Sequence, residues 1–168
     1  MKVRKRTAKD YRVSRWSGGE TREFLLFPDG ASYAGRDFLW RVSSATVELA
    51  ESDFTPLPDY RRFLTPLSGA LRLSQNGGAF RALGALEVLE FDGGAETKSR
   101  GEVTDFNLML RKGKAEGGAS GLSSPGGHLR RRCGGGLLAL PGAAYSPSAY
   151  ASRSYSRGSG RPAAYTTC

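Results

Sequence analysis

Residues 36–69 decide the fold, and they read RDFLWRVSSATVELAESDFTPLPDYRRFLTPLSG. The part from 38 to 49 is rich in aromatic and β-branched residues and contains neither glycine nor proline, which predicts one long strand. Alternation along this strand predicts that Phe38, Trp40 and Val42 share an apolar face, backed by Arg41 and Ser43. Prolines at 56 and 58 interrupt the chain, a second strand runs over 62–67, and a glycine turn ends it.

The same pattern of short strands and turns continues on both sides of this stretch. An edge strand is predicted before residue 16, and further strands at 21–27, 70–73, 86–91 and 103–110, with a polar loop over 96–102. Alternation places Thr21, Glu23 and Leu25 on one face of their strand, and Asp105 and Asn107 together on one face of the last strand. No segment repeats with a helical period, so the sequence predicts an all-β sandwich or barrel.

Six blocks of this sequence, in order, resemble the signature of the HutD/Ves family of cupin-like proteins. The blocks are WSGGETRE at 16–23, FLWRVSSA at 38–45, FTPLPDYRR at 54–62, LSG at 67–69, FDGG at 91–94 and DFNLM at 105–109. The resemblance covers residues 10–114, about two thirds of the chain. It implies a cupin-type jelly roll of the RmlC-like kind over 1–115, the first half of a two-half cupin.

Residues 116–168 have a different composition. From residue 117 onward there is no Asp, Glu, Lys, Asn, Gln, Val, Ile, Phe, Trp or Met. Such a segment buries too little apolar surface to offset the entropy of ordering, so a disordered low-complexity tail is predicted. Because the family continues here into a second set of strands, we favour the hypothesis that the tail is an out-of-frame translation of a GC-rich coding region. A genuine low-complexity tail is the alternative.

Charge and composition restrict the function classes. The net charge of +9 divides into 19 basic against 15 acidic residues over 1–115, which is +4, and six arginines against Glu116 over 116–168, which is +5. The body is therefore only mildly basic and a nucleic-acid partner is not favoured, although the tail arginines at 130–132 and 153–161 leave RNA contact as an alternative. No apolar run could span a membrane and no apolar segment follows the basic start, so a cytoplasmic location is expected.

Metal and nucleophile chemistry lack the residues that they need. The single histidine, His128, and the two cysteines, Cys133 and Cys168, all lie in the tail. Three or four converging ligands are needed for a metal, so neither a metal nor any other cofactor is predicted. The same shortage of histidine excludes Ser-His-Asp and Cys-His arrangements in the body.

A set of polar residues on the predicted strand faces is the better candidate for a site. Because a barrel turns alternate residues inward, these side chains could line a small cavity. The planar fork of arginine suits a carboxylate ligand. The predicted ligand-binding residues are Thr21, Glu23, Arg41, Ser43, Arg62, Asp105 and Asn107.

Each member of this set also has a structural interpretation. Glu23 and Arg41 could form an internal ion pair, and Asp105 and Asn107 could bond neighbouring backbone. An unassigned enzyme that uses Glu23 and Asp105 as acid and base is a further alternative.

The resemblance implies a link with histidine utilisation and a pathway intermediate such as formiminoglutamate. Its carboxylates would suit Arg41 or Arg62, and its formimino group Glu23 or Asp105. We therefore expect a non-enzymatic binding protein for a small amino-acid-derived acid. If the second half is missing, an uncovered apolar face predicts self-association, and a homodimer is one form of it.

Overall fold

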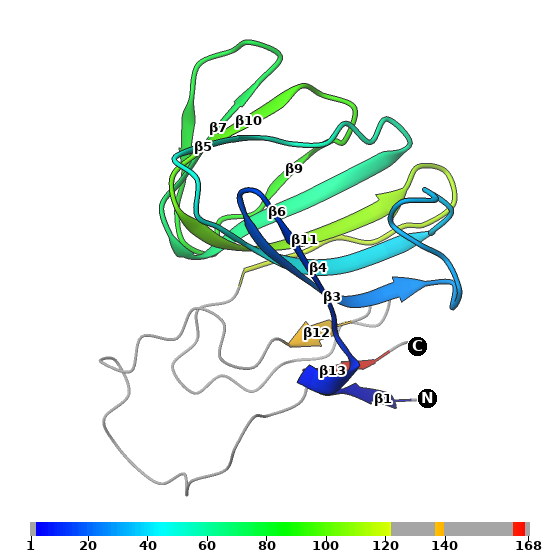
Figure 1. Ribbon diagram of the computed structural model, residues 1–168. Helices are drawn as coiled ribbons and strands as arrows, with labels where there is room; N and C mark the ends of the chain where they lie inside the picture. Colours follow the sequence, from blue (N-terminus) through cyan, green and yellow to red (C-terminus); the bar gives the residue numbers. More distant parts are fainter. Residues whose placement is uncertain (1–2, 122–136, 140–162, 167–168) are drawn as a thin grey trace, which may run out of the picture.

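The computed structural model describes residues 3–121, 137–139 and 163–166, and within these ranges the chain is almost entirely β-structure (Figure 1). The helical part of these ranges is a single 3₁₀ turn, η1 (Ala8–Asp10). The strands are β1 (Val3–Arg6), β2 (Arg12–Trp16), β3 (Gly19–Phe27), β4 (Trp40–Val47), β5 (Glu51–Asp53), β6 (Tyr60–Gly69), β7 (Leu71–Gln75), β8 (Arg81–Leu83), β9 (Leu89–Asp92), β10 (Thr97–Arg100), β11 (Val103–Arg111), β12 (Leu137–Ala139) and β13 (Ala163–Thr166).

Two antiparallel sheets form the body, as expected for a cupin-type jelly roll. The larger has the order β2-β3-β4-β11-β6-β9, and the smaller has the order β5-β10-β7-β8. In Figure 1 the smaller sheet lies above one broad face of the larger. We call this face the inner face. A third sheet, β1-β13-β12, joins the start of the chain to two short segments of the tail.

Three strands of the larger sheet continue directly into three of the smaller one, and two glycines allow this corner. β4, β11 and β6 are neighbours in one sheet, and their continuations β5, β10 and β7 are neighbours in the same order in the other. Gly69 and Gly101 stand at the corner with φ of +85° and +106°. A Cβ on Gly69 would lie 2.3 Å from the Glu102 carbonyl oxygen, and one on Gly101 would lie 2.2 Å from that of Ala70. The corner therefore requires residues without a side chain at both positions.

Apolar side chains occupy both ends of the inner face and leave its middle to polar ones. At the corner end, Val47, Leu64 and Val103 pack against Leu71, Leu73 and Leu83 of the smaller sheet. At the other end, Phe38, Leu57, Tyr60 and Met109 form a second cluster. Strand β11 crosses both clusters, and between Val103 and Met109 it places Asp105 and Asn107, both buried. The predicted pairing of these two residues on one face is correct.

Two expectations about side-chain faces are wrong. Phe38 lies before β4 and packs at the inner face, whereas Trp40 and Val42 belong to the opposite, outer face. In β3 the register shifts between Glu23 and Leu25, so Leu25 packs at the outer face with Val42 while Leu26 packs beside Phe38. A bulge inserts one residue into a strand and reverses the alternation beyond it, which a strict period of two cannot anticipate.

Several element boundaries also differ from the prediction. The long central strand is limited to β4 (Trp40–Val47), and residues 97–100 form strand β10 where a polar loop was predicted. β10 has the polar sequence TKSR and pairs with β5 on one side and β7 on the other. Backbone pairing on both edges stabilises this strand, so its own side chains carry little signal.

The predicted disorder of residues 116–168 falls largely outside the described residues. Within that range residues 137–139 and 163–166 are strands, and residues 116–121 continue from the body. The basic runs at 130–132 and 153–161, His128 and both cysteines lie outside the described residues. No helix in the described ranges has the length and hydropathy needed to cross a membrane.

Candidate ligand-binding site

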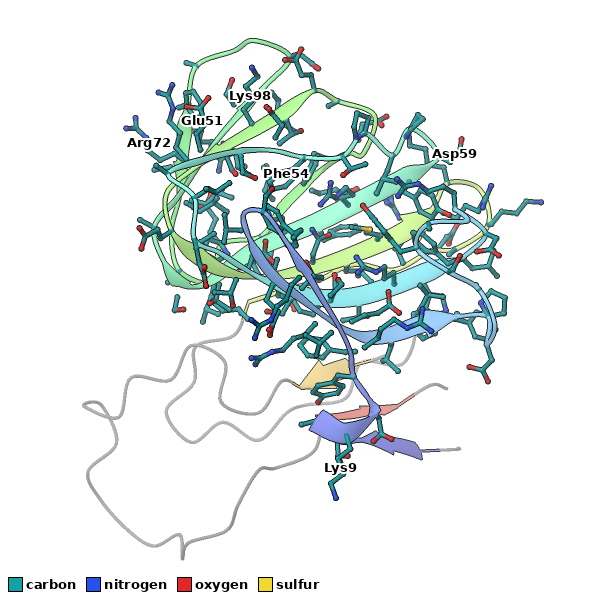
Figure 2. All side chains as sticks on the ribbon, in the orientation of Figure 1. Lys9, Glu51, Phe54, Asp59, Arg72 and Lys98 are labelled. Atoms are coloured by element: carbon teal, nitrogen blue, oxygen red, sulfur yellow. The ribbon has the colours of Figure 1, made fainter. Side chains whose placement is uncertain are left out.

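A cavity of about 260 Å³ opens on the inner face, between the two apolar clusters. Its lining comes from β2, β3, β4, β6 and β11, from Tyr33 in the β3–β4 loop, and from residues 52–55 after the corner. Figure 2 places Phe54 of this last segment between the two sheets. The corner of the jelly roll therefore forms part of the cavity, because the chain after it runs back across the larger sheet and residues 52–55 become one wall.

Six of the seven predicted site residues line this cavity. They are Thr21, Arg41, Ser43, Arg62, Asp105 and Asn107. The seventh, Glu23, does not line it. Most of these residues lie on β4 and β11, which are neighbours in the sheet. Every second residue of each strand points to the inner face, so their side chains meet there.

Glu23 instead forms an ion pair with Arg41, which is the structural alternative to ligand binding that the sequence also allows. Its Oε2 lies 2.7 Å from Arg41 Nε, and both side chains are nearly buried, with exposed fractions of 12% and 7%. Arg41 Nη1 also donates to Ser43 Oγ at 3.1 Å, and its guanidinium stacks 4.4 Å from the centre of the Tyr33 ring. The charge of Arg41 is therefore matched within the protein.

Within the part of the chain that the structure describes, Arg62 forms no such ion pair with a carboxylate. Its guanidinium lies between the rings of Phe54 and Phe91, at 4.8 and 5.2 Å from their centres. Its Nε is buried and makes no hydrogen bond to the described residues. Burial lowers the pKa of Arg62 to about 10, against the opposing influence of Tyr33 and Asp105, so the group stays charged at neutral pH.

Asp105 and Asn107 add two buried acceptors beside Arg62. Asp105 Oδ1 accepts the backbone N–H of Ala45 at 3.0 Å, which is the cross-strand bond that the structural interpretation predicted. Burial raises the pKa of Asp105 to about 6, although the Ala45 N–H and the charges of Arg62 and Arg41 act in the opposite direction. Asn107 Oδ1 is buried and makes no hydrogen bond to the described residues.

Aromatic residues of the wall complete the site, and sequence reasoning assigned none of them to the ligand set. Tyr33 and Phe54 come from irregular segments, where no alternation indicates a face. Burial alone would raise the pKa of Tyr33, but hydrogen bonds with Arg36 and Thr55 and the nearby guanidinium charges outweigh burial and lower it. Trp16, at the edge of β2, lines the cavity and is 40% exposed, a position that its Gly-Gly turn could have suggested.

The described residues contain no group of three or more His, Cys, Asp or Glu side chains able to hold a metal ion. The cavity offers instead two guanidinium groups, two carboxyl groups, one amide and several hydroxyls. Buried polar groups without partners are costly in a core, so their concentration here points to a ligand that bonds to them. The arrangement suits recognition of a small anion or polar acid.

Comparison with known proteins agrees with this fold. A family model described as HutD matches residues 8–140, which extends beyond the signature blocks that end at residue 109. HutD from Pseudomonas fluorescens SBW25 is 27% identical, with a TM-score of 0.57 over 66% of this chain and 61% of that one. A conserved protein of unknown function from Pseudomonas aeruginosa PAO1 is 30% identical, with a TM-score of 0.58 over 67% and 59%.

The chain thus spans about three fifths of the length of these two relatives. No curated protein matches the sequence at a significant level. The family match covers well over half of the chain, and the two structural relatives share its jelly roll. The protein belongs to the HutD family.

Proposed function

We propose that the cavity binds a small amino-acid-derived acid without converting it, in connection with histidine utilisation or its regulation. The observation that supports this most directly is Arg62, a buried guanidinium whose Nε has no hydrogen-bond partner among the described residues. A carboxylate that enters the cavity can supply that partner through charge-assisted hydrogen bonds. Asn107 Oδ1, also without a partner, can accept an N–H of the same ligand.

The size and polarity of the cavity support this ligand class. A volume of about 260 Å³ fits a small metabolite, and two phenylalanine rings hold Arg62 in place before the ligand arrives. Formiminoglutamate is the candidate that we test first, because it combines carboxylates with a nitrogen-bearing group. Its carboxylates would face Arg62 and Arg41, and its nitrogen Asn107.

The alternative of a metal-independent enzyme loses support from the position of Glu23. Glu23 is paired with Arg41 and lies outside the cavity lining, so only Asp105 of the two proposed acid–base residues faces the ligand space. The RNA alternative concerns tail arginines outside the described residues. We therefore rank the binding protein first and use turnover as the discriminating measurement.

The test is calorimetric titration of the full chain with formiminoglutamate. Replacing Arg62 by methionine keeps the volume of the side chain and removes its charge, and we expect affinity to fall about 10- to 100-fold, the value of one or two charged hydrogen bonds. Arg61→Met is the matched control, because Arg61 is 40% exposed and pairs with Glu90 outside the cavity. Equal affinities in the two variants would contradict the proposal, and conversion of the ligand by the wild type would favour the enzyme.

A further inference from the structure

Asp105 lies at the centre of the charged groups that surround the cavity. It is 4% exposed and sits on β11, between β4 with Arg41 and β6 with Arg62. Tyr33 lines the cavity from the loop before β4, and Asp53 lines it from the end of β5. Glu23 reaches the group only through its ion pair with Arg41.

The charges around the cavity determine how favourably an anion can bind there. Glu23 already neutralises Arg41 at 2.7 Å, so among the buried charged residues of the described lining Arg62 and Asp105 are the two that form no ion pair. Asp105 forms no ion pair within 4 Å with either of these two arginines. If Asp105 were ionised, a bound carboxylate would place two negative charges beside one buried guanidinium. Two carboxylates that share such a site cannot both ionise without a large cost.

The geometry leaves one atom of Asp105 free to hold a proton. Oδ1 already accepts the Ala45 N–H, so Oδ2 is the oxygen that can carry the proton and donate it to a ligand. A cationic nitrogen on the ligand could also neutralise Asp105, but it would have to approach between Arg41 and Arg62. The charge of Arg62, which also lowers the pKa of Tyr33, makes that approach unfavourable.

We propose that the cavity takes up one proton together with the acid, and that Asp105 Oδ2 holds this proton and donates it to the bound carboxylate. Asp105 would then act as a neutral hydrogen-bond donor next to the positive Arg62, and the loaded site would carry balanced charge. This inference rests on the proposed acid-binding function. The raised pKa of Asp105, about 6 through burial, supports it because little free energy is then needed to protonate the group near neutral pH.

The experiment titrates the full chain with sodium formate at pH 5 to 8 and constant ionic strength, followed by NMR of the Ala45 and Asn107 amides. Formate carries a carboxylate and no nitrogen, so it isolates the proposed proton from any charge on a ligand amine. In the wild type we expect the dissociation constant to rise about tenfold per pH unit above pH 6, the slope for one coupled proton. In Asp105→Asn, which keeps Oδ1 for the Ala45 N–H and offers a neutral donor, the dissociation constant should not depend on pH.

Two control variants assign the proton to Asp105. Asp53→Asn changes an exposed carboxylate at the same cavity and should keep the wild-type slope. Tyr33→Phe should also keep it, and a slope that disappears in Tyr33→Phe would place the proton on the phenol and overturn the proposal. Binding of formate by the wild type with no pH dependence would overturn the proton uptake alone. No binding of formate at any pH would overturn both this inference and the acid site on which it rests.

A second measurement keeps the test valid if Asp105→Asn does not fold. The ¹³C resonance of the Asp105 carboxyl group in the wild type reports its protonation directly. We expect its titration to move to higher pH when formate is added, because the bound anion stabilises the protonated form. A titration that is unchanged by formate would overturn the proposal.

Discussion

Arg41 and Arg62 are equally buried but have different environments. Both are opposite Met109, one on each side of β11, and each has an exposed fraction of 6%. Glu23 forms an ion pair with Arg41, while Arg62 packs between two phenylalanine rings and forms no ion pair within the described residues. A buried ion pair is a structural element, whereas a buried arginine without a carboxylate partner is a candidate for ligand binding. The difference depends on one neighbouring residue, Glu23, that reaches only one of the two.

Asp105 predicts a pH dependence of stability in the absence of ligand. Burial raises its pKa from 3.8 to about 6, so the folded state binds the proton more tightly than the unfolded state. Its contribution is fully present below about pH 4 and is lost as the pH rises through 6. Asp105→Asn should therefore match the wild type near pH 3.5 and exceed it at pH 8 by up to about 3 kcal/mol of unfolding free energy. Urea denaturation at both pH values measures this difference.

Asp92 is a control for this prediction, because its effect on the free energy of unfolding should change with pH in the opposite direction. The hydrogen bond from Lys112, together with that from the Gly94 N–H, lowers the pKa of this exposed carboxyl group. Its contribution is present above the unfolded pKa and is lost as the pH falls. Asp92→Asn should therefore be less stable than the wild type at pH 8 and approach it in acid. If the two substitutions changed the free energy of unfolding with pH in the same direction, burial would not be the cause of the raised pKa of Asp105.

At the scale of elements, the corner between the sheets is the feature on which the cavity depends. Three strands turn there together, and the backbone of the β6–β7 connection lies directly against that of the β10–β11 connection. The Ala70 N–H donates to the Glu102 carbonyl at 3.2 Å, and the Gly101 N–H donates to that of Ala50 at 3.0 Å. A displaced corner would move the 52–55 segment, and with it one wall of the cavity.

Gly101→Ala should accordingly destabilise the fold more than an ordinary glycine substitution. The new Cβ would combine an unfavourable φ of +106° with a contact of 2.2 Å to a carbonyl oxygen, and we expect a loss of about 2 to 4 kcal/mol. Gly30→Ala is the matched control, since Gly30 has a φ of +91° and a Cβ added there would meet no atom within 4 Å. It should lose only about 1 kcal/mol. Thermal unfolding of both variants measures the steric contribution. Equal losses of stability in the two variants would contradict the prediction.

At the scale of the whole molecule, the outer face of the larger sheet is the surface most suited to association. Phe24, Leu25 and Val42 form a buried apolar cluster there, with the half-buried Trp40, Phe106 and Leu108 packed beside it. Phe27 stacks on Trp40 at 5.5 Å and remains 42% exposed, and Val13 is 51% exposed. Exposed apolar side chains such as these two commonly mark a contact surface.

We therefore expect the chain to self-associate through this face. Sedimentation velocity over a range of concentrations should show a mass that rises with concentration, and Phe27→Ser should reduce that rise. Leu49→Ser, a change at a comparably exposed apolar residue near the Trp16 turn, is the control and should leave the association unchanged. A monomer at all concentrations would count against the prediction.

The sequence by itself determined the fold class and most of the polar set on the inner face. Alternation is a local property with a period of two, so it placed Asp105 with Asn107 and Arg41 with Ser43 without any knowledge of the partners. The signature blocks added the cupin-type jelly roll.

Only the tertiary structure decided which of these residues share a cavity and which neutralise each other. The bulge in β3, the polar strand β10 and the positions of Tyr33 and Phe54 depend on strand pairing and on loops that no periodic pattern describes. The pairing of Glu23 with Arg41, and the lack of such a partner for Arg62, depend on distances between strands far apart in sequence. Electrostatic energy depends on those distances and on burial, and neither is fixed before the sheets close on each other.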